Sequence, residues 1–216
     1  MLIEHHRSQA GFTLVELLIS SILTLLVLGA IYSVYQMQIH TVKAQERRLE
    51  AQEYARAVLD LMVREIRNAA YNPLGATGGA NCAGGGVGVP SVVTATATSF
   101  RFTYDANADG DCDDTSEDVT YGWDTTSCAA GLGNITRDDG TGAVWLTDCN
   151  VSVFALSYYQ QDGTVIAPPV TGATLANIYR VLITLTVQST NPDGNYGGGQ
   201  LNASMNSNAE LRNRGL

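Results

Sequence analysis

The stretch GFTLVELLISSILTLLVLGAIYSVY runs from Gly11 to Tyr35, and the rest of this chain is organised around it. It is a run of about 24 nearly all apolar residues, which is long enough to cross a bilayer as one helix. One charge interrupts it, Glu16, and a carboxylate at that depth costs about 2.5–3.5 kcal/mol on insertion scales, so its presence needs a reason. A short polar leader, residues 1–11, precedes the run. A secretory signal has the reverse order, with its apolar run before a small-residue cleavage site.

The order of polar leader, Gly11, Phe12 and apolar run, with Glu16 in register, resembles the class III signal of type IV prepilins and type II secretion pseudopilins. The resemblance implies cleavage after Gly11 by prepilin peptidase, which also methylates the new amine of Phe12. It further implies that Glu16 neutralises the Phe12 amine of a neighbouring subunit, and a buried cation and anion do offset each other's desolvation. An ordinary membrane anchor with a stray glutamate is the alternative. A lipoprotein signal is excluded because no cysteine lies near the leader.

Charge is spread unevenly along the 216-residue chain, whose formal net charge is −9. Residues 12–70 have six basic and six acidic side chains, whereas residues 71–216 have five and fourteen. The second part therefore carries the whole excess. An acidic surface argues against binding to nucleic acid, because that affinity comes from neutralising phosphates. It favours cation binding or simple solubility.

The four cysteines, Cys82, Cys112, Cys128 and Cys149, all lie beyond the apolar run, in the part that a prepilin exposes to the periplasm. An even number in an oxidising compartment favours two disulfides, for which three pairings exist. We favour Cys128–Cys149, which would close a local hairpin region, with Cys82–Cys112 joining two loops. Zinc is the alternative, and it is disfavoured because there is no CxxC spacing and no histidine beyond residue 70.

Beyond Tyr35 the sequence becomes polar but keeps a helical period. Its apolar residues form one broad stripe, which comprises Ile39, Val42, Leu49, Val58, Leu59, Met62, Val63 and Ile66. Because no proline occurs before Pro73, the helix can run from about Phe12 to about Ala70, roughly 90 Å. The predicted organisation is a leader (1–11), a transmembrane or filament-core helix (12–35), an amphipathic half-helix (36–70) and a head (71–216). The stretch from Val58 to Ile66 should pack against the head.

The head changes to a period of two after a Gly-rich loop, residues 74–91, which lacks a phosphate-binding GxGxxG between strand and helix. Strands are predicted at 91–104, 118–123, 133–137, 143–146, 151–160, 164–166, 178–190 and 201–212. A helix followed by strands predicts an α+β, pilin-like fold, in which a long N-terminal helical spine packs on an antiparallel β-sheet head.

Several head segments, taken in order, are similar to those of PilW-like minor pilins. They are Asp118–Tyr121, Ile135–Arg137, Asn150–Val151, Tyr158–Tyr159, Asp162–Gly163, Ile178–Val187 and Leu211–Asn213. The long Gly-rich loop, the four cysteines and an arginine-poor last strand depart from that pattern.

An acidic loop, residues 105–118, carries the chemistry that we predict for the head. It contains seven of the fourteen acidic residues of the head, and its start fits the calcium-loop pattern D-x-[DN]-x-[DN]-G, in which alternate side chains converge on one hard cation. The predicted ligands of a structural Ca²⁺ are Asp105, Asn107, Asp109, Asp111, Asp113 and Glu117. The closing glutamate of the pattern is out of register, so either Glu117 or Asp118 would close the site. A solvated acidic hairpin tip is the alternative.

No catalytic site is predicted, because the head lacks histidine and so cannot hold a Ser/His or Cys/His pair. We expect a minor pilin of a type IV pilus rather than an enzyme. Its expected partners are other pilins, prepilin peptidase, the inner-membrane assembly platform and membrane lipid, with no nucleic acid. The head would face the periplasm from the inner membrane and then the cell surface in the filament. The alternatives are a J-type pseudopilin of a type II secretion system and a ligand-binding tip adhesin.

Overall fold

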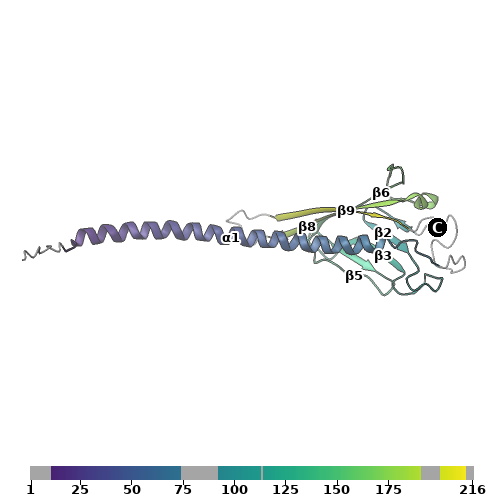
Figure 1. Cartoon of the computed structure of the whole chain (residues 1–216), viewed down its shortest axis with the longest axis horizontal. Helices are drawn as coiled ribbons and strands as arrows, with labels where there is room; N and C mark the ends of the chain where they lie inside the picture. Colours follow the sequence, from purple (N-terminus) through teal and green to yellow (C-terminus); the bar gives the residue numbers. More distant parts are fainter. Residues whose placement is uncertain (1–10, 74–91, 113, 191–199, 213–216) are drawn as a thin grey trace, which may run out of the picture.

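The computed structural model describes residues 11–73, 92–112, 114–190 and 200–212. Within these residues one α-helix is followed by a β-rich head (Figure 1). The elements are α1 (Leu14–Ile66), β1 (Val92–Ala95), β2 (Ser99–Thr103), β3 (Asp118–Asp124), β4 (Asn134–Asp138), β5 (Val144–Trp145), β6 (Val151–Tyr159), β7 (Val165–Ile166), the 3₁₀ helix η1 (Gly172–Asn177), β8 (Arg180–Thr190) and β9 (Gln200–Glu210).

The spine is a single helix of 53 residues, roughly 80 Å long. It begins after Thr13, and its last turn is closed by Arg67, whose N–H donates to the carbonyl oxygen of Val63 at 3.1 Å. Residues 67–70 form turns rather than the continued helix that the sequence predicted. Ala70 then takes a positive φ of 68°, which turns the chain back toward the head.

The first half of α1 projects away from the head, and its apolar side chains are exposed (Figure 1). Among the described residues, α1 is the one helix long and apolar enough to cross a membrane, and its most apolar window has no part buried within the chain. About 24 apolar residues cannot remain in water, so this half must be covered by lipid or by other helices.

The strands form two antiparallel sheets rather than the single sheet expected. The first has the order β1-β2-β3-β4-β5 and the second the order β7-β6-β8-β9. The longest pairing is β8 with β9, which runs without a bulge from Arg180 opposite Glu210 to Thr190 opposite Gln200. The segment predicted as one strand over 91–104 is a hairpin, β1 and β2, with a turn at residues 96–98.

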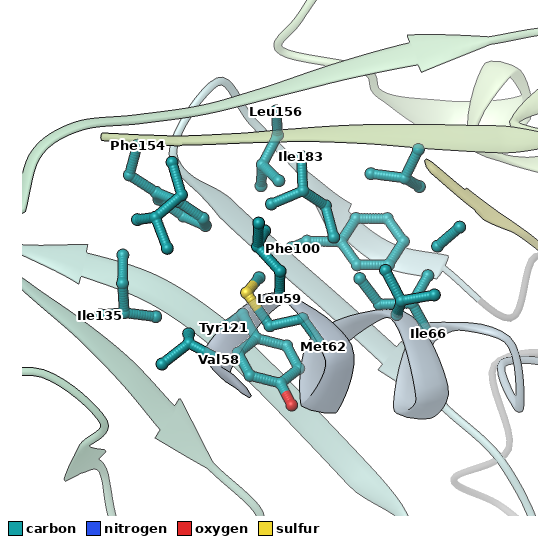
Figure 2. Packing of buried hydrophobic residues seen from close by; sticks show 14 of the residues in the cluster. Val58, Leu59, Met62, Ile66, Phe100, Tyr121, Ile135, Phe154, Leu156 and Ile183 are labelled. Carbon is teal, nitrogen blue, oxygen red and sulfur yellow. The ribbon is translucent and has the colours of Figure 1, made fainter. Parts of the chain in front are cut away.

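The core lies between the second half of α1 and the two sheets. Figure 2 shows Leu59 and Met62 of the helix pointing toward Phe100 of one sheet and Ile183 of the other. The buried helix residues are Ala51, Ala55, Val58, Leu59, Met62, Val63 and Ile66. The predicted packing face, from Val58 to Ile66, is therefore confirmed, and so is the α+β, pilin-like fold. The earlier part of the predicted stripe differs, since Val42 and Leu49 are exposed.

Candidate functional site

The predicted cleavage point lies just outside the helix. Gly11 and Phe12 are exposed and not helical, and Thr13 is the N-cap residue of α1 in extended conformation. No heavy atom outside its chain neighbours lies within 4 Å of where a Cβ of Gly11 would be. The Gly11–Phe12 bond therefore lies in an exposed, non-helical segment.

Glu16 is held by a capping box at the start of α1. Its Oε2 accepts hydrogen bonds from the backbone N–H of Thr13 at 3.0 Å and from the Thr13 hydroxyl at 2.9 Å. In return, the Thr13 Oγ1 accepts from the backbone N–H of Glu16 at 3.3 Å. The carboxylate is thus stabilised within its own chain, beside the position of the predicted new amine.

Two carboxylates of the acidic loop are buried and organise its backbone. Asp105 is 0% exposed and accepts from the N–H groups of Ala108 at 2.6 Å and Gly110 at 3.1 Å. Glu117 is 1% exposed and accepts from Ala106 at 2.9 Å and from Asp114 at 3.2 Å. These bonds offset the cost of burying charge and fix the direction of both carboxylates.

The remaining acidic side chains of the loop lie nearer to solvent. Asp109 and Asp114 are exposed, and the side-chain amide of Asn107 donates to both of them, at 2.9 and 2.8 Å. Asp111 is partly exposed, and its N–H donates to Asp109 Oδ1 at 3.2 Å. The predicted ligand Asp113 lies outside the described residues.

The structure brings Asp105, Asp109 and Glu117 together, with one carboxylate oxygen of each within 4.8 Å of the others. Asp118, the other residue considered for closing the loop, points away and forms an ion pair with Arg101, whose Nε donates to it at 2.8 Å. Glu117 is thus the residue placed to close a cation site. Convergent hard oxygens are the donor set that Ca²⁺ takes, so the residues present fit this ion.

A disulfide joins Cys128, in the β3–β4 loop, to Cys149, which directly precedes the β6 region. It closes a segment with a sequence separation of 21. This is one of the two pairs that the sequence favoured. The other pair, Cys82–Cys112, includes Cys82, which lies outside the described residues.

Sequence reasoning missed a polar network between the spine and the first sheet. Glu65 of α1 accepts a hydrogen bond from the hydroxyl of Tyr121 at 2.5 Å and an ion-paired one from Arg137 Nε at 3.0 Å. Arg137 Nη1 also donates to Asp139 at 2.7 Å. The carbonyl oxygen of Asp139 accepts from Ser116 at 3.0 Å, which ties the acidic loop to the same network. Only the fold brings these residues together, since Arg137 lies 72 positions from Glu65.

Comparison with known families decides what kind of chain this is. A family model described as prepilin peptidase-dependent protein B matches residues 44–203, which is well over half of the chain. The prokaryotic N-terminal methylation motif matches residues 6–32. This chain belongs to the prepilin peptidase-dependent protein B family. Searches among curated proteins and among solved structures found no match.

For a member of the prepilin peptidase-dependent protein B family, processing by prepilin peptidase is implied. The matched methylation motif contains Gly11, Phe12 and Glu16, so the family evidence falls on the segment whose geometry is described above. The predicted type IV prepilin-like signal is therefore confirmed. The signal and the exposed apolar helix together indicate anchoring in a membrane.

Proposed function

We propose that this family member is a minor pilin of a type IV pilus, a structural subunit that helps to start assembly, and not an enzyme. The observation that carries the proposal is the first half of α1, which is apolar and uncovered yet carries Glu16 beside the processing site. A plain anchor needs no carboxylate there, whereas a helix that moves from lipid into a bundle of like helices can use one.

The capping box suggests how Glu16 would serve both states. In the membrane, Thr13 satisfies the carboxylate within the chain. After cleavage, Phe12 supplies a free amine, and in a filament the Glu16 of one subunit would pair with the Phe12 amine of its neighbour. The pair would fix the axial register between subunits, because either charge alone is costly in an apolar bundle. The head would face the periplasm before assembly and the cell surface afterwards.

The proposal is tested by replacing Glu16 with alanine. The variant should insert into the membrane and be cleaved normally, because those steps use the apolar run and the Gly11–Phe12 bond. Its amount in sheared pili should fall about a hundredfold or more, since an unpaired buried amine costs about 3–5 kcal/mol. Thr24→Ala, two turns further along the same exposed helix, is the matched control and should be incorporated normally. Normal incorporation of Glu16→Ala would contradict the register role.

A J-type pseudopilin of a type II secretion system is the second candidate, because it shares the processed signal and the helical spine. The PilW-like assignment and the choice between these systems stay predictions. Deletion of the gene separates them: a minor pilin is needed for surface pili, and a pseudopilin is needed for protein secretion. A tip adhesin would instead leave the number of pili unchanged and remove binding to a surface or glycan.

We also propose that the acidic loop binds a structural Ca²⁺. Asp105, Asp109 and Glu117 would supply carboxylate oxygens, and the bonds from Ala108, Gly110 and Ala106 keep two of these groups in place. The bound cation would supply positive charge that relieves the repulsion among the loop carboxylates. The cation would stabilise the conformation of the loop and its hydrogen bonds to Tyr71 and Asp139.

A further inference from the structure

The arginines of the head are nearly all engaged within the chain. Arg101 pairs with Asp118, and Arg137 pairs with Glu65 and Asp139. The guanidinium of Arg180 lies over the ring of Tyr159, 4.4 Å from its centroid. The remaining arginine of the described head residues is Arg212, just beyond the end of β9, which forms no ion pair within the part of the chain that the structure describes.

Arg212 lies with two helix arginines around a shallow hollow of about 380 Å³. Arg64 and Arg67 are one turn apart on α1, and all three arginines are exposed. The other lining residues are Asp60, Val63 and Asn68. The lining has one carboxylate, Asp60, and three guanidinium groups, so the hollow is a positively charged surface on a chain whose net charge is −9.

The acidic loop lies at the same end of the spine but on another side. Glu65, next to Arg64, points to β3 and β4 through Tyr121 and Arg137, and neighbouring helix residues are about 100° apart around the axis. The loop itself is bonded to the chain just past the helix, where the N–H of Asp105 donates to the Tyr71 carbonyl at 2.8 Å. The loop starts, and the hollow lies, near the C-terminal end of α1.

We propose that the arginine hollow receives the acidic loop of a second copy of this chain, through the exposed carboxylate of Asp114, which is not among the ligands proposed for Ca²⁺. The inference rests on the proposed function, because a filament places the spines parallel and side by side. Anchoring of each copy in a membrane by its N-terminal helix imposes the same arrangement. In parallel copies this end of each spine lies beside that of the next, so the hollow of one copy can face the loop of its neighbour. Because the two surfaces differ, the contact is heterologous and repeats from copy to copy.

Other anionic occupants fit less well. Arg64 lies about 50 residues along α1 from Leu14, roughly 75 Å, which places the hollow beyond the reach of lipid headgroups. Nucleic acid is disfavoured by the net charge of −9. Exposed ion pairs are individually weak, so the contact depends on the high effective concentration that a shared membrane or filament provides.

The sequence offers a direct test, because Lys43 is its only lysine. Arg67→Lys keeps the charge of the hollow and adds one amine that a water-soluble carbodiimide can couple to a carboxylate. The full-length variant is prepared in light and heavy nitrogen isotopes, mixed, and placed in phosphatidylcholine vesicles. After coupling, peptides are mapped by mass spectrometry. We expect crosslinks between position 67 of one isotope and the peptide containing residues 105–118 of the other.

Arg56→Lys is the matched control, since it is exposed on α1 but does not line the hollow. We expect mixed-isotope crosslinks to the acidic loop to be at least about fivefold more abundant from position 67 than from position 56. That excess should disappear when Arg64→Glu and Arg212→Glu are added, or when salt is raised from roughly 0.05 to roughly 0.5 M. Equal yields from the two positions, or crosslinks within one isotope only, would overturn the proposal. These outcomes do not depend on pilus formation, so they are separate from the Glu16 test.

Discussion

Arg137 is the residue on which the junction between spine and head depends. Its guanidinium lies between the carboxylates of Glu65 and Asp139, with side chains that are 16%, 16% and 19% exposed. Burial and the hydrogen bond to Glu65 raise the pKa of Tyr121, so its hydroxyl remains a donor. A partly buried charge set of this kind is stable only when every member has its partner.

Asp139 gives this junction a pH dependence. Hydrogen bonds from Thr141 and Arg137 lower the pKa of its carboxyl from 3.8 to about 2 in the folded chain. A group whose folded pKa is depressed stabilises the fold when it is ionised, so its contribution is present above the unfolded pKa and is lost as the pH falls through the folded one. Asp139→Asn should therefore be less stable than the parent at pH ~5, and this difference should shrink between pH ~4 and pH ~2.

Urea unfolding of the full-length chain in detergent, followed by tryptophan fluorescence, measures that difference. Asp60→Asn, on the exposed side of α1, provides the control for a general loss of one negative charge. A difference between Asp139→Asn and the parent that stays constant down to pH ~2 would contradict the account.

At the scale of elements, the sequence predicted most strands because their patterns are local. β6, β8 and β9 alternate clearly, and each was expected within a few residues of its observed bounds. The hairpin of β1 and β2 was missed because no glycine or proline marks its turn. There, the Thr96 Oγ1 accepts from the N–H of Ser99 at 2.9 Å and closes a turn inside a run of β-branched residues.

The candidate sites likewise divide into those made of neighbouring residues, which the sequence indicated, and those that join distant residues, which it did not. The signal segment and the acidic loop are continuous in sequence, so the resemblance to prepilin signals pointed to Gly11 and Glu16, and the calcium-loop spacing pointed to Asp105 and Asp109. The Glu65–Arg137 pair and the arginine hollow join residues far apart in the chain, and no local pattern marks them. The extent of the buried stripe on α1 was also not readable, because the sequence does not say where the head ends against the helix.

Two leucines of that stripe provide a controlled comparison. Leu59 is 2% exposed and Leu49 is 57% exposed on the same helix. Leu59→Ala should lower the free energy of unfolding by about 3 kcal/mol, because it removes buried methyl groups and leaves a cavity. Leu49→Ala should change it by less than about 0.5 kcal/mol in the detergent-solubilised monomer. Urea unfolding measures both, and equal losses would contradict the packing of α1 described above.

As a whole, the molecule combines an uncovered apolar half-helix with a head that closes around the other half of the same helix (Figure 1). The helix packs against β8 and β9 of the second sheet, and Glu65 bonds it to β3 and β4 of the first. Any force on the spine therefore acts on both sheets. The acidic loop belongs to this junction, because Asp105 bonds to Tyr71 and Ser116 bonds to Asp139.

Calcium should consequently change the stability of the head and not only of the loop. We expect the melting temperature of the full-length chain in detergent to rise by about 5 °C or more in excess calcium over chelator, since saturating a site at about a hundred times its Kd adds about 2.7 kcal/mol. Asp105→Ala combined with Asp109→Ala should abolish the calcium-dependent rise, whatever its effect on the melting temperature in chelator. Asp60→Ala combined with Asp148→Ala removes the same charge from exposed positions elsewhere and should keep the rise. An equal melting temperature of the parent chain in calcium and in chelator would contradict the cation site. The loop would then be a folded acidic turn without a cation, because the carboxylates of Asp105 and Glu117 are already held by the backbone N–H groups of Ala106, Ala108, Gly110 and Asp114.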